Sequence, residues 1–186
     1  TAQIEALTTA QLVALDSADV AALSAAQVAA LTTAQALAMT IEQVTALSTA
    51  QLQAMQTVDL AALATDRIAA LSTAQVEALG TAQVVALTTA QVRALSADQL
   101  AVLTTAQIRA LATDDVVALS TDQVVALSSD QFAALNTAQV VALSSAQVAA
   151  IEVADLAGLS VAQVQALETA DIAALSLAQV VGLSAA

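Results

Sequence analysis

Carboxylates are the side chains of this sequence that are best suited to chemistry. The 186 residues include 16 Asp and Glu and only three Arg, and there is no His, Cys, Lys or Tyr. Without His or Cys the chain cannot assemble a Ser-His-Asp or Cys-His arrangement, and without Lys it cannot form a Schiff base. The sequence therefore predicts that the protein is not an enzyme and has no catalytic residues.

Metal binding is the remaining chemistry that carboxylates allow. Asp114 and Asp115 are adjacent, but neighbours on a helix diverge by about 100° and make a poor acid-base pair. Asp122 and Asp130 continue the position of Asp114 at a spacing of eight residues, so the three could line one side of a coil and hold a hard cation such as Ca²⁺. We favour the simpler interpretation of solvated outward carboxylates, and predict no metal site and no cofactor. No glycine-rich phosphate loop is found.

An eight-residue pattern organises these carboxylates and the rest of the chain. The octad Leu143–Ala150 reads LSSAQVAA and recurs with few changes from Thr1 to Ala186, without insertion or deletion. We name its positions after this octad: leucine, cap, first, second, glutamine, valine, outer and alanine. Residues 1–186 are expected to form one array of about 23 repeats, an excerpt of a longer chain.

Two conformations fit the octad poorly. In a strand, the valine and leucine positions, three residues apart, would face opposite sides, and the chain has three Gly and no Pro to make turns. In one continuous helix, the apolar stripe would rotate by about 80° per octad and never form a seam. We therefore rank the β-solenoid low and the single helix second.

A helix that restarts in every repeat explains the pattern best. Ser144 is then the N-cap and Gln147 the third helical residue, which is the capping-box spacing. Leu143 before the cap can pack on Val148 as a hydrophobic staple. The sequence predicts an all-α solenoid, a superhelical coil of short capped helices with one helix per repeat. We expect three or four repeats per turn.

A helical wheel over the seven residues after the cap separates two faces. Gln147, Val148, Ala150 and Ile151 fall on the inner arc, and the small alanine position should let a neighbouring helix approach closely. The outer position is variable, as shown by Glu5, Thr45, Gln53, Glu77, Arg93, Arg109 and Gln165. At the glutamine position, Asp replaces Gln five times, which we interpret as structural (Asp19, Asp59, Asp115, Asp155 and Asp171). Arg67 at this position needs a partner, and Asp66 beside it is too local to be a convincing one.

Charge and hydropathy exclude two kinds of partner. A net charge of −13 opposes binding to nucleic acid, where Lys and Arg supply the affinity. Although 59% of the residues are hydrophobic, no uninterrupted apolar stretch is nearly as long as the roughly 20 residues that a membrane-spanning helix needs. We expect no nucleic acid and no membrane insertion. Apolar residues at the ends should be exposed and favour end-to-end self-association (Ile4, Leu7, Val180 and Leu183).

The repeats resemble two known kinds of sequence. Leu87-Thr88-Thr89-Ala90-Gln91-Val92 resembles the first helix of transcription activator-like effector repeats over six to nine residues, which implies a capped short helix but no DNA binding. The whole chain is similar to octapeptide arrays of the Leu-Ser-Thr-Ala-Gln-Val-x-Ala type in large bacterial secreted or surface proteins, which are adhesin-like. That resemblance implies a stalk outside the cell and no site.

From these observations we expect a structural repeat region that acts as a rigid spacer or stalk, at the cell surface or outside the cell. The alternative is a scaffold that binds a protein or glycan through its outward face. A binder of a regular surface should keep the outer position uniform. Its variety, with Glu5, Val13, Leu37 and Arg93 at one position, favours the spacer.

Overall fold

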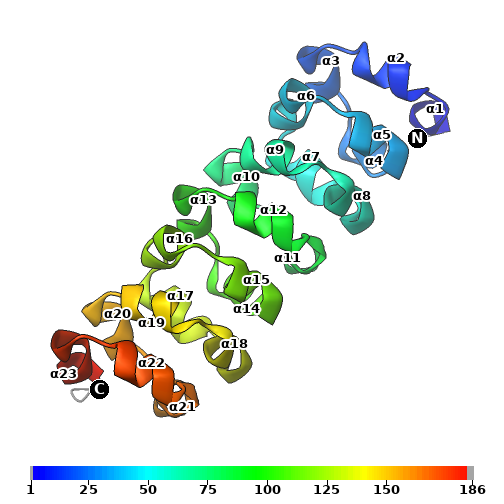
Figure 1. Cartoon of the computed structure of the whole chain (residues 1–186). Coiled ribbons are helices and arrows are strands. Elements are labelled where there is room, and N and C mark those ends of the chain that lie inside the picture. The colour runs from blue at the N-terminus through cyan, green and yellow to red at the C-terminus, as the bar shows by residue number, and fades with distance from the viewer. Residues whose placement is uncertain (1, 184–186) are drawn as a thin grey trace. The chain divides into compact units, whose positions relative to one another are not determined.

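Short helices follow one another along the whole of the described chain. The computed structural model describes residues 2–183, and this range contains 23 α-helices and no strand (Figure 1). The chain divides into two compact units, Thr1–Leu95 and Ser96–Ala186. The all-α prediction is confirmed, and a single continuous helix is excluded.

The helices of the first unit are α1 Ala2–Glu5, α2 Thr9–Val13, α3 Ser17–Ala21, α4 Ala25–Val28, α5 Thr33–Ala38, α6 Ile41–Ala46, α7 Thr49–Ala54, α8 Thr57–Ala62, α9 Thr65–Ala69, α10 Thr73–Glu77, α11 Thr81–Ala86 and α12 Thr89–Ala94. Those of the second unit are α13 Ala97–Ala101, α14 Thr105–Ala110, α15 Thr113–Ala118, α16 Thr121–Val125, α17 Ser129–Ala134, α18 Thr137–Ala142, α19 Ser145–Ala150, α20 Val153–Ala157, α21 Val161–Ala166, α22 Thr169–Ala174 and α23 Leu177–Leu183.

From α2 onwards, each helix begins directly after the cap position of its octad. Ser144 has extended backbone angles, its Oγ accepts a hydrogen bond from the Gln147 N–H at 3.3 Å, and the Gln147 Oε1 accepts from the Ser144 N–H at 2.8 Å. These two bonds satisfy N–H groups that have no partner within the helix. The capping box is confirmed here and in most other repeats.

The helices end without the left-handed residue that commonly closes a helix. No residue of the described range has a positive φ. After α18, Leu143 (φ −63°, ψ 135°) and Ser144 (φ −74°, ψ 155°) form a two-residue extended link, and α19 begins at the next residue. The wheel over seven residues was therefore slightly too long, because the leucine position lies in the link.

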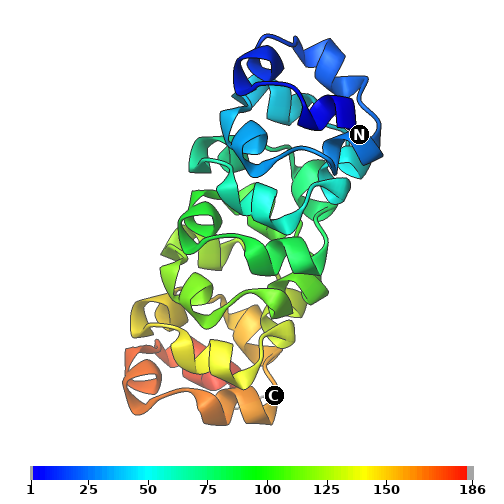
Figure 2. The same ribbon diagram turned by 90° about the vertical axis from the view of Figure 1, so that its right-hand side faces the viewer.

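Within each unit, helices pack against the helix three further along the chain. In the first unit these pairs run from α2 with α5 to α9 with α12, and in the second from α13 with α16 to α20 with α23. One turn of the coil therefore contains three octads, so of the three or four repeats per turn that we expected, three is correct. Figures 1 and 2 show these turns as stacked layers inside each unit.

The valine and leucine positions fill the centre of each coil. Val148 is fully buried, and Leu143 and Ile151 are 6% and 2% exposed, as the inner face predicts. Ala36 and Phe132, the smallest and the aromatic residue at the valine position, are buried as well. The exposed-end prediction holds for Val180, which is 43% exposed, but is wrong for Ile4, which is only 7% exposed in α1. Leu7 and Leu183 are half-buried.

The alanine position lies against the first residue of the helix one turn earlier. A Cβ added at Gly158 would lie 3.7 Å from the Ser129 Cβ, which is an ordinary contact. A Cβ added at Gly182 would lie only 2.7 Å from the Val153 Cγ1, which is too close for two carbon atoms. This repeat therefore has no room for the methyl group that alanine carries at this position. The larger Val153 at the first position explains the smaller Gly182, and the expected close approach of helices is confirmed at these positions.

Replacing Gly182→Ala should destabilise the second unit by about 1–3 kcal/mol, because the β-branched Val153 cannot rotate away from the new methyl. Val153→Ala removes the clashing Cγ1 and should restore most of the loss in the double variant. The measurement is thermal unfolding of both single variants and the pair. Additive effects would show that the two side chains are not in contact.

Aspartate substitution should separate the inner from the outer face. Leu143→Asp places an unpaired charge in the core and should cost more than about 3 kcal/mol, whereas Val141→Asp at a position 47% exposed should stay within about 0.5 kcal/mol. Circular dichroism during chemical unfolding measures both. Similar losses in the two variants would mean that the faces are assigned wrongly.

Candidate functional site

The side chain at the glutamine position makes contacts that the capping box does not require. Gln147 is 3% exposed, and its Oε1 accepts from the Ser144 N–H that begins its own helix. Its Nε2 points the other way and donates to Val116 O at 2.9 Å and Leu119 O at 2.9 Å, with Val117 O at 3.4 Å. These carbonyls lie at the C-terminal end of α15, one turn earlier in the coil. One amide therefore joins a helix start to a helix end.

The same bridge recurs in both units, at sequence separations of 31, 30 and 28 residues. Gln91, for example, donates to Leu60 O at 3.0 Å and Leu63 O at 2.7 Å, and Gln163 donates to Phe132 O and Leu135 O, each at 2.9 Å. Further glutamines in the described residues repeat the pattern: Gln35, Gln43, Gln51, Gln75, Gln83, Gln131, Gln139 and Gln179.

The bridge explains how helices without a glycine cap can end inside a protein. The last carbonyls of any helix lack intrahelical partners, and a buried carbonyl without a donor costs about 1–3 kcal/mol. Here the donor is the amide of the following turn. Sequence reasoning missed this role because the contact spans 28–31 residues. A signal was present, since a capping box accepts Glu as well as Gln, yet no Glu occupies this position.

Aspartates at the glutamine position keep part of this arrangement. Asp115 and Asp171 accept from the cap N–H at 3.1 and 3.0 Å, as glutamine does. Asp171 and Asp59 also accept from a hydroxyl at the first position of the helix three earlier, Ser145 at 2.8 Å and Thr33 at 2.7 Å. A carboxylate accepts but cannot donate, so these repeats do not make the bond to the helix end. They are structural substitutes, as predicted.

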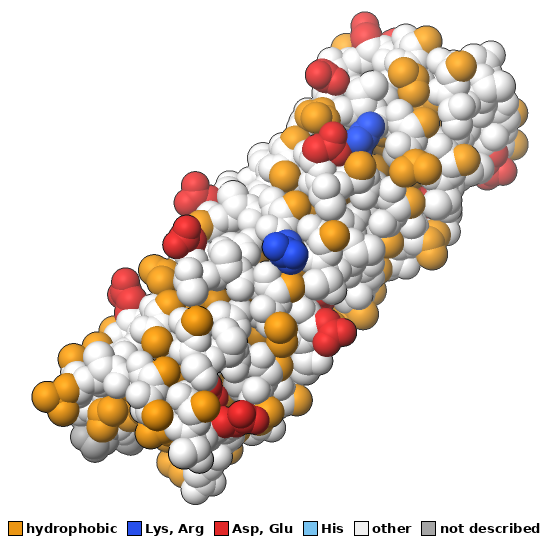
Figure 3. Space-filling model, in the orientation of Figure 1, with side chains coloured by type: hydrophobic (Ala, Val, Ile, Leu, Met, Phe, Trp, Pro, Cys, Tyr) orange, Lys and Arg blue, Asp and Glu red, His pale blue; other side chains and the backbone are white. Residues whose placement is uncertain are grey.

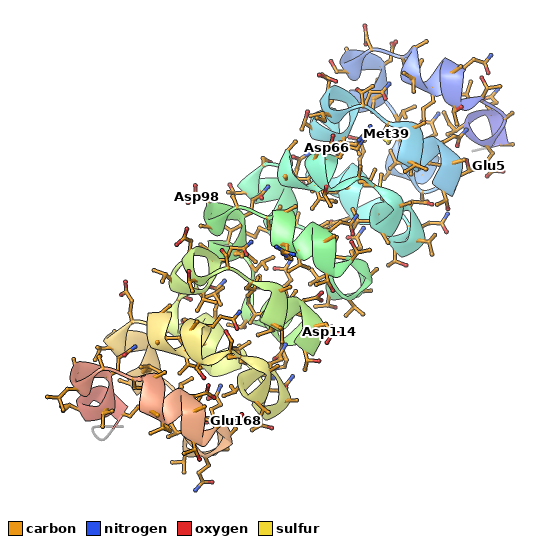
Figure 4. All side chains as sticks on the ribbon, viewed as in Figure 1. Glu5, Met39, Asp66, Asp98, Asp114 and Glu168 are labelled. Carbon is orange, nitrogen blue, oxygen red and sulfur yellow. The ribbon has the colours of Figure 1, made fainter. Side chains whose placement is uncertain are left out.

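Arg67 keeps the opposite half of the bridge. Its Nε donates to Met39 O at 2.7 Å, at the 28-residue separation used by the glutamines, and its Nη1 pairs with the Asp66 carboxylate at 2.9 Å. Figure 4 labels Asp66 and Met39, the two residues to which Arg67 bonds. A guanidinium cannot accept a bond, so Arg67 cannot accept from the Ala64 N–H as a glutamine would, and Ala64 itself has no side-chain acceptor to cap α9. Asp66, which seemed too local, is indeed the partner of Arg67.

Some residues at the outer position also connect turns. Gln53 Nε2 donates to Ala78 O at 2.7 Å, and Arg109 Nε donates to Ala134 O at 3.2 Å, both across 25 residues. The outer position is exposed, as predicted, but it is not uniformly without structural contacts. Each of these bonds joins helices three apart, α7 to α10 and α14 to α17.

The carboxylates considered for metal binding are not brought together. Asp114, Asp122 and Asp130 are exposed on α15, α16 and α17, which follow one another around a single turn. Residues 2–183 contain no group of three or more His, Cys, Asp or Glu that could hold a metal ion. Figure 3 shows carboxylates scattered over the visible face, and Figure 4 places Asp98 and Asp114 on opposite sides of the second unit. The described residues therefore do not assemble Asp114, Asp122 and Asp130 into a shared Ca²⁺ site.

Helix starts do influence one exposed carboxylate. Glu42 is the second residue of α6, where hydrogen bonds from its own backbone N–H and from Thr40 lower the pKa of its carboxyl. This is the behaviour expected of a negative charge at a helix N-terminus. In the described range, no helix is long and apolar enough to cross a membrane.

Comparison with known proteins identifies the repeat. A family model described as the ALTTAQ repeat matches residues 12–49, 52–89, 85–113, 109–145 and 148–185. No curated protein matches the chain. The six letters of the description are spelled by residues 86–91, which run from the end of α11 to the glutamine position of α12. The motif thus covers one corner of the coil and the amide that bridges to the turn before.

Gln147→Glu should be strongly destabilising although it preserves a capping box. The new carboxylate faces Val116 O and Leu119 O without a proton to donate, so we expect a loss of more than about 2 kcal/mol at pH 7. Burial against two carbonyl oxygens raises the pKa of the new carboxyl, and its protonated form can donate, so the difference from the natural protein should shrink as the pH falls towards about 4.3, the ordinary value for Glu. Gln165→Glu, at an exposed outer position, is the control and should change stability by less than about 0.5 kcal/mol. Chemical unfolding as a function of pH measures the effect; equal stability of the two variants would refute the bridge.

Proposed function

The chain belongs to the ALTTAQ repeat family, and from this premise we propose that it is a structural spacer. In this proposal it is a stiff helical array that holds other parts of a larger protein apart. The observation that carries the proposal is the repetition of one contact set. In octad after octad, a glutamine amide joins the start of its own helix to the end of a helix one turn earlier. A fixed contact between successive turns gives a fixed increment of length.

The increment follows from the packing of helices. Three octads, or 24 residues, make one turn, and the helices of successive turns pack directly on one another. Packed helices lie about 8–10 Å apart, so each turn adds about that length. A spacer built in this way changes its reach by changing its repeat number, without any new contact.

Several kinds of contact within each unit support stiffness. The valine and leucine positions are buried in the centre, the glutamine amides cross from turn to turn inside, and Gln53 and Arg109 cross on the outside. A turn can bend away from its neighbour only by breaking these contacts together. A flexible linker, in contrast, has no contacts to break.

A position at the cell surface or outside the cell is part of the proposal. It is supported by the similarity of the octad to repeat regions of large bacterial surface proteins. The net charge of −13 keeps neighbouring copies apart through mutual repulsion, which suits an exposed stalk.

A binding scaffold is the second candidate, and one observation favours it. Val13, Leu37 and Val85 occupy the outer position of α2, α5 and α11 and are 42%, 56% and 62% exposed. With α8 these helices stack into one side of the first unit, so their apolar side chains form a row. A row of this kind could hold a protein or glycan. Replacing Val13, Leu37 and Val85 together by serine separates the two candidate functions. If the protein is a binding scaffold, this variant should lose saturable binding of its partner while the length of the array stays the same.

The spacer proposal predicts linear growth. Proteins with one, two or three extra copies of residues 121–144, inserted after residue 144, should gain about 8–10 Å in maximum dimension per copy. Small-angle scattering measures this dimension, and light scattering verifies that the proteins are monomeric. Inserts of the same composition in scrambled order are the control and should not give this increment. A maximum dimension that is unchanged by three ordered copies would contradict the spacer.

A further inference from the structure

An open cavity of about 580 Å³ lies in the first unit, where the glutamine pattern is broken. Its walls come from the end of α4, the starts of α5 and α8, and Glu5 of α1. Polar groups at Glu5, Thr32, Thr33, Gln56 and Asp59 alternate with an apolar wall of three alanines, Leu31 and Val58. Figure 4 shows Glu5 at the edge of the coil.

Asp59 carries a buried carboxylate oxygen without a donor. The side chain is 1% exposed, and its Oδ1 accepts from the Thr33 hydroxyl at 2.7 Å. Its Oδ2 is buried and has no hydrogen-bond partner. At Asp115 and Asp171, the corresponding Oδ2 accepts from the cap N–H. Asp59 has lost that partner, which leaves a buried negative oxygen that no protein group neutralises.

The helix end facing this position also lacks side-chain donors, although Val28 O accepts from the backbone N–H of Leu31 at 3.1 Å. The glutamine bridges elsewhere reach carbonyls 31 and 28 residues earlier in the chain. A glutamine at position 59 would therefore donate to Val28 O and Leu31 O. Asp59 cannot donate, and Gln56 Nε2 reaches only Ala29 O, at 3.0 Å. No side chain of residues 2–183 donates to the carbonyls of Val28 and Leu31, and Leu31 lines the cavity. The cavity therefore has acceptors and negative charge, and it lacks cationic donors.

We propose that this cavity binds a linear alkylamine, with its ammonium group on Asp59. A primary ammonium has a positive charge and three N–H donors, which match the Asp59 Oδ2, the Leu31 carbonyl and the hydroxyls at the start of α5. Its alkyl chain lies along the alanines and Val58. Glu5 at the rim provides a second carboxylate, so a diamine binds more tightly than a monoamine. This site is independent of the spacer proposal.

A metal ion fits the cavity less well. The described residues contain no cluster of three or more metal-ligating side chains, and a single ion would leave most of about 580 Å³ and the apolar wall unused. Ca²⁺ also requires six to eight oxygen ligands. Calcium therefore serves as the competing probe in the experiment.

The test is calorimetric titration of the full chain with 1,4-diaminobutane, n-butylamine and calcium chloride, in a buffer without amines. The diamine should bind one to one and more tightly than butylamine, and calcium should not bind at this site. Asp59→Asn, which keeps the shape and removes the charge, should weaken diamine binding by about tenfold or more. Glu5→Gln should bring the diamine to the affinity of butylamine.

The control is Asp155→Asn, at the same position of the octad in the second unit, which should bind the diamine as the natural protein does. The diamine should also raise the thermal midpoint of the natural protein and of the Asp155 variant, but not that of the Asp59 variant. Binding that survives Asp59→Asn, an equal loss in both Asp variants, or binding of calcium alone would overturn the proposal.

Discussion

Helices of four to seven residues leave many of their backbone groups without intrahelical partners, and the structure depends on how these groups are satisfied. The N–H groups at the helix starts are satisfied locally, by a Ser or Thr cap and by the glutamine oxygen. The carbonyls at the helix ends are satisfied from a neighbouring turn, because the amide nitrogen of the same glutamine donates to carbonyls one turn earlier. One planar amide thus supplies an acceptor to one helix and a donor to another, which is why neither Glu nor Ala can replace it fully.

This constraint also accounts for the exceptions. Asp115 and Asp171 retain the acceptor and lose the donor, whereas Arg67 retains a donor to Met39 O and loses the acceptor for the N–H of Ala64 before α9. At Asp59 the donor moves to Gln56, three residues earlier, which reaches Ala29 O. The cavity that we propose as an amine site is lined by Asp59 and Gln56. Where the substitution is incomplete, the coil has an unpaired acceptor, and an unpaired acceptor is what a cationic ligand needs.

Much of the local structure could be predicted from the octad. The cap, the box, the inward valine and leucine positions and the restart of the helix all follow from spacing within eight residues. Three octads per turn do not, because the angle at each corner depends on packing between helices three apart. The glutamine bridge was missed for the same reason, although the absence of Glu from that position indicated that an amide nitrogen is needed. The pairing of Val153 with Gly182 likewise spans 29 residues and is visible only in the structure.

Hydrogen exchange of the glutamine side-chain amides tests the bridge most directly. In protein labelled with ¹⁵N at glutamine, the Nε2 protons of Gln91, Gln147 and Gln163 can be compared by NMR with those of the exposed Gln165. If each buried amide donates to carbonyls one turn earlier, its protons should exchange at least about a hundredfold more slowly than those of Gln165, since exchange requires local opening of the coil. Exchange of all four side chains at the same rate would show that the amides do not hold the turns together.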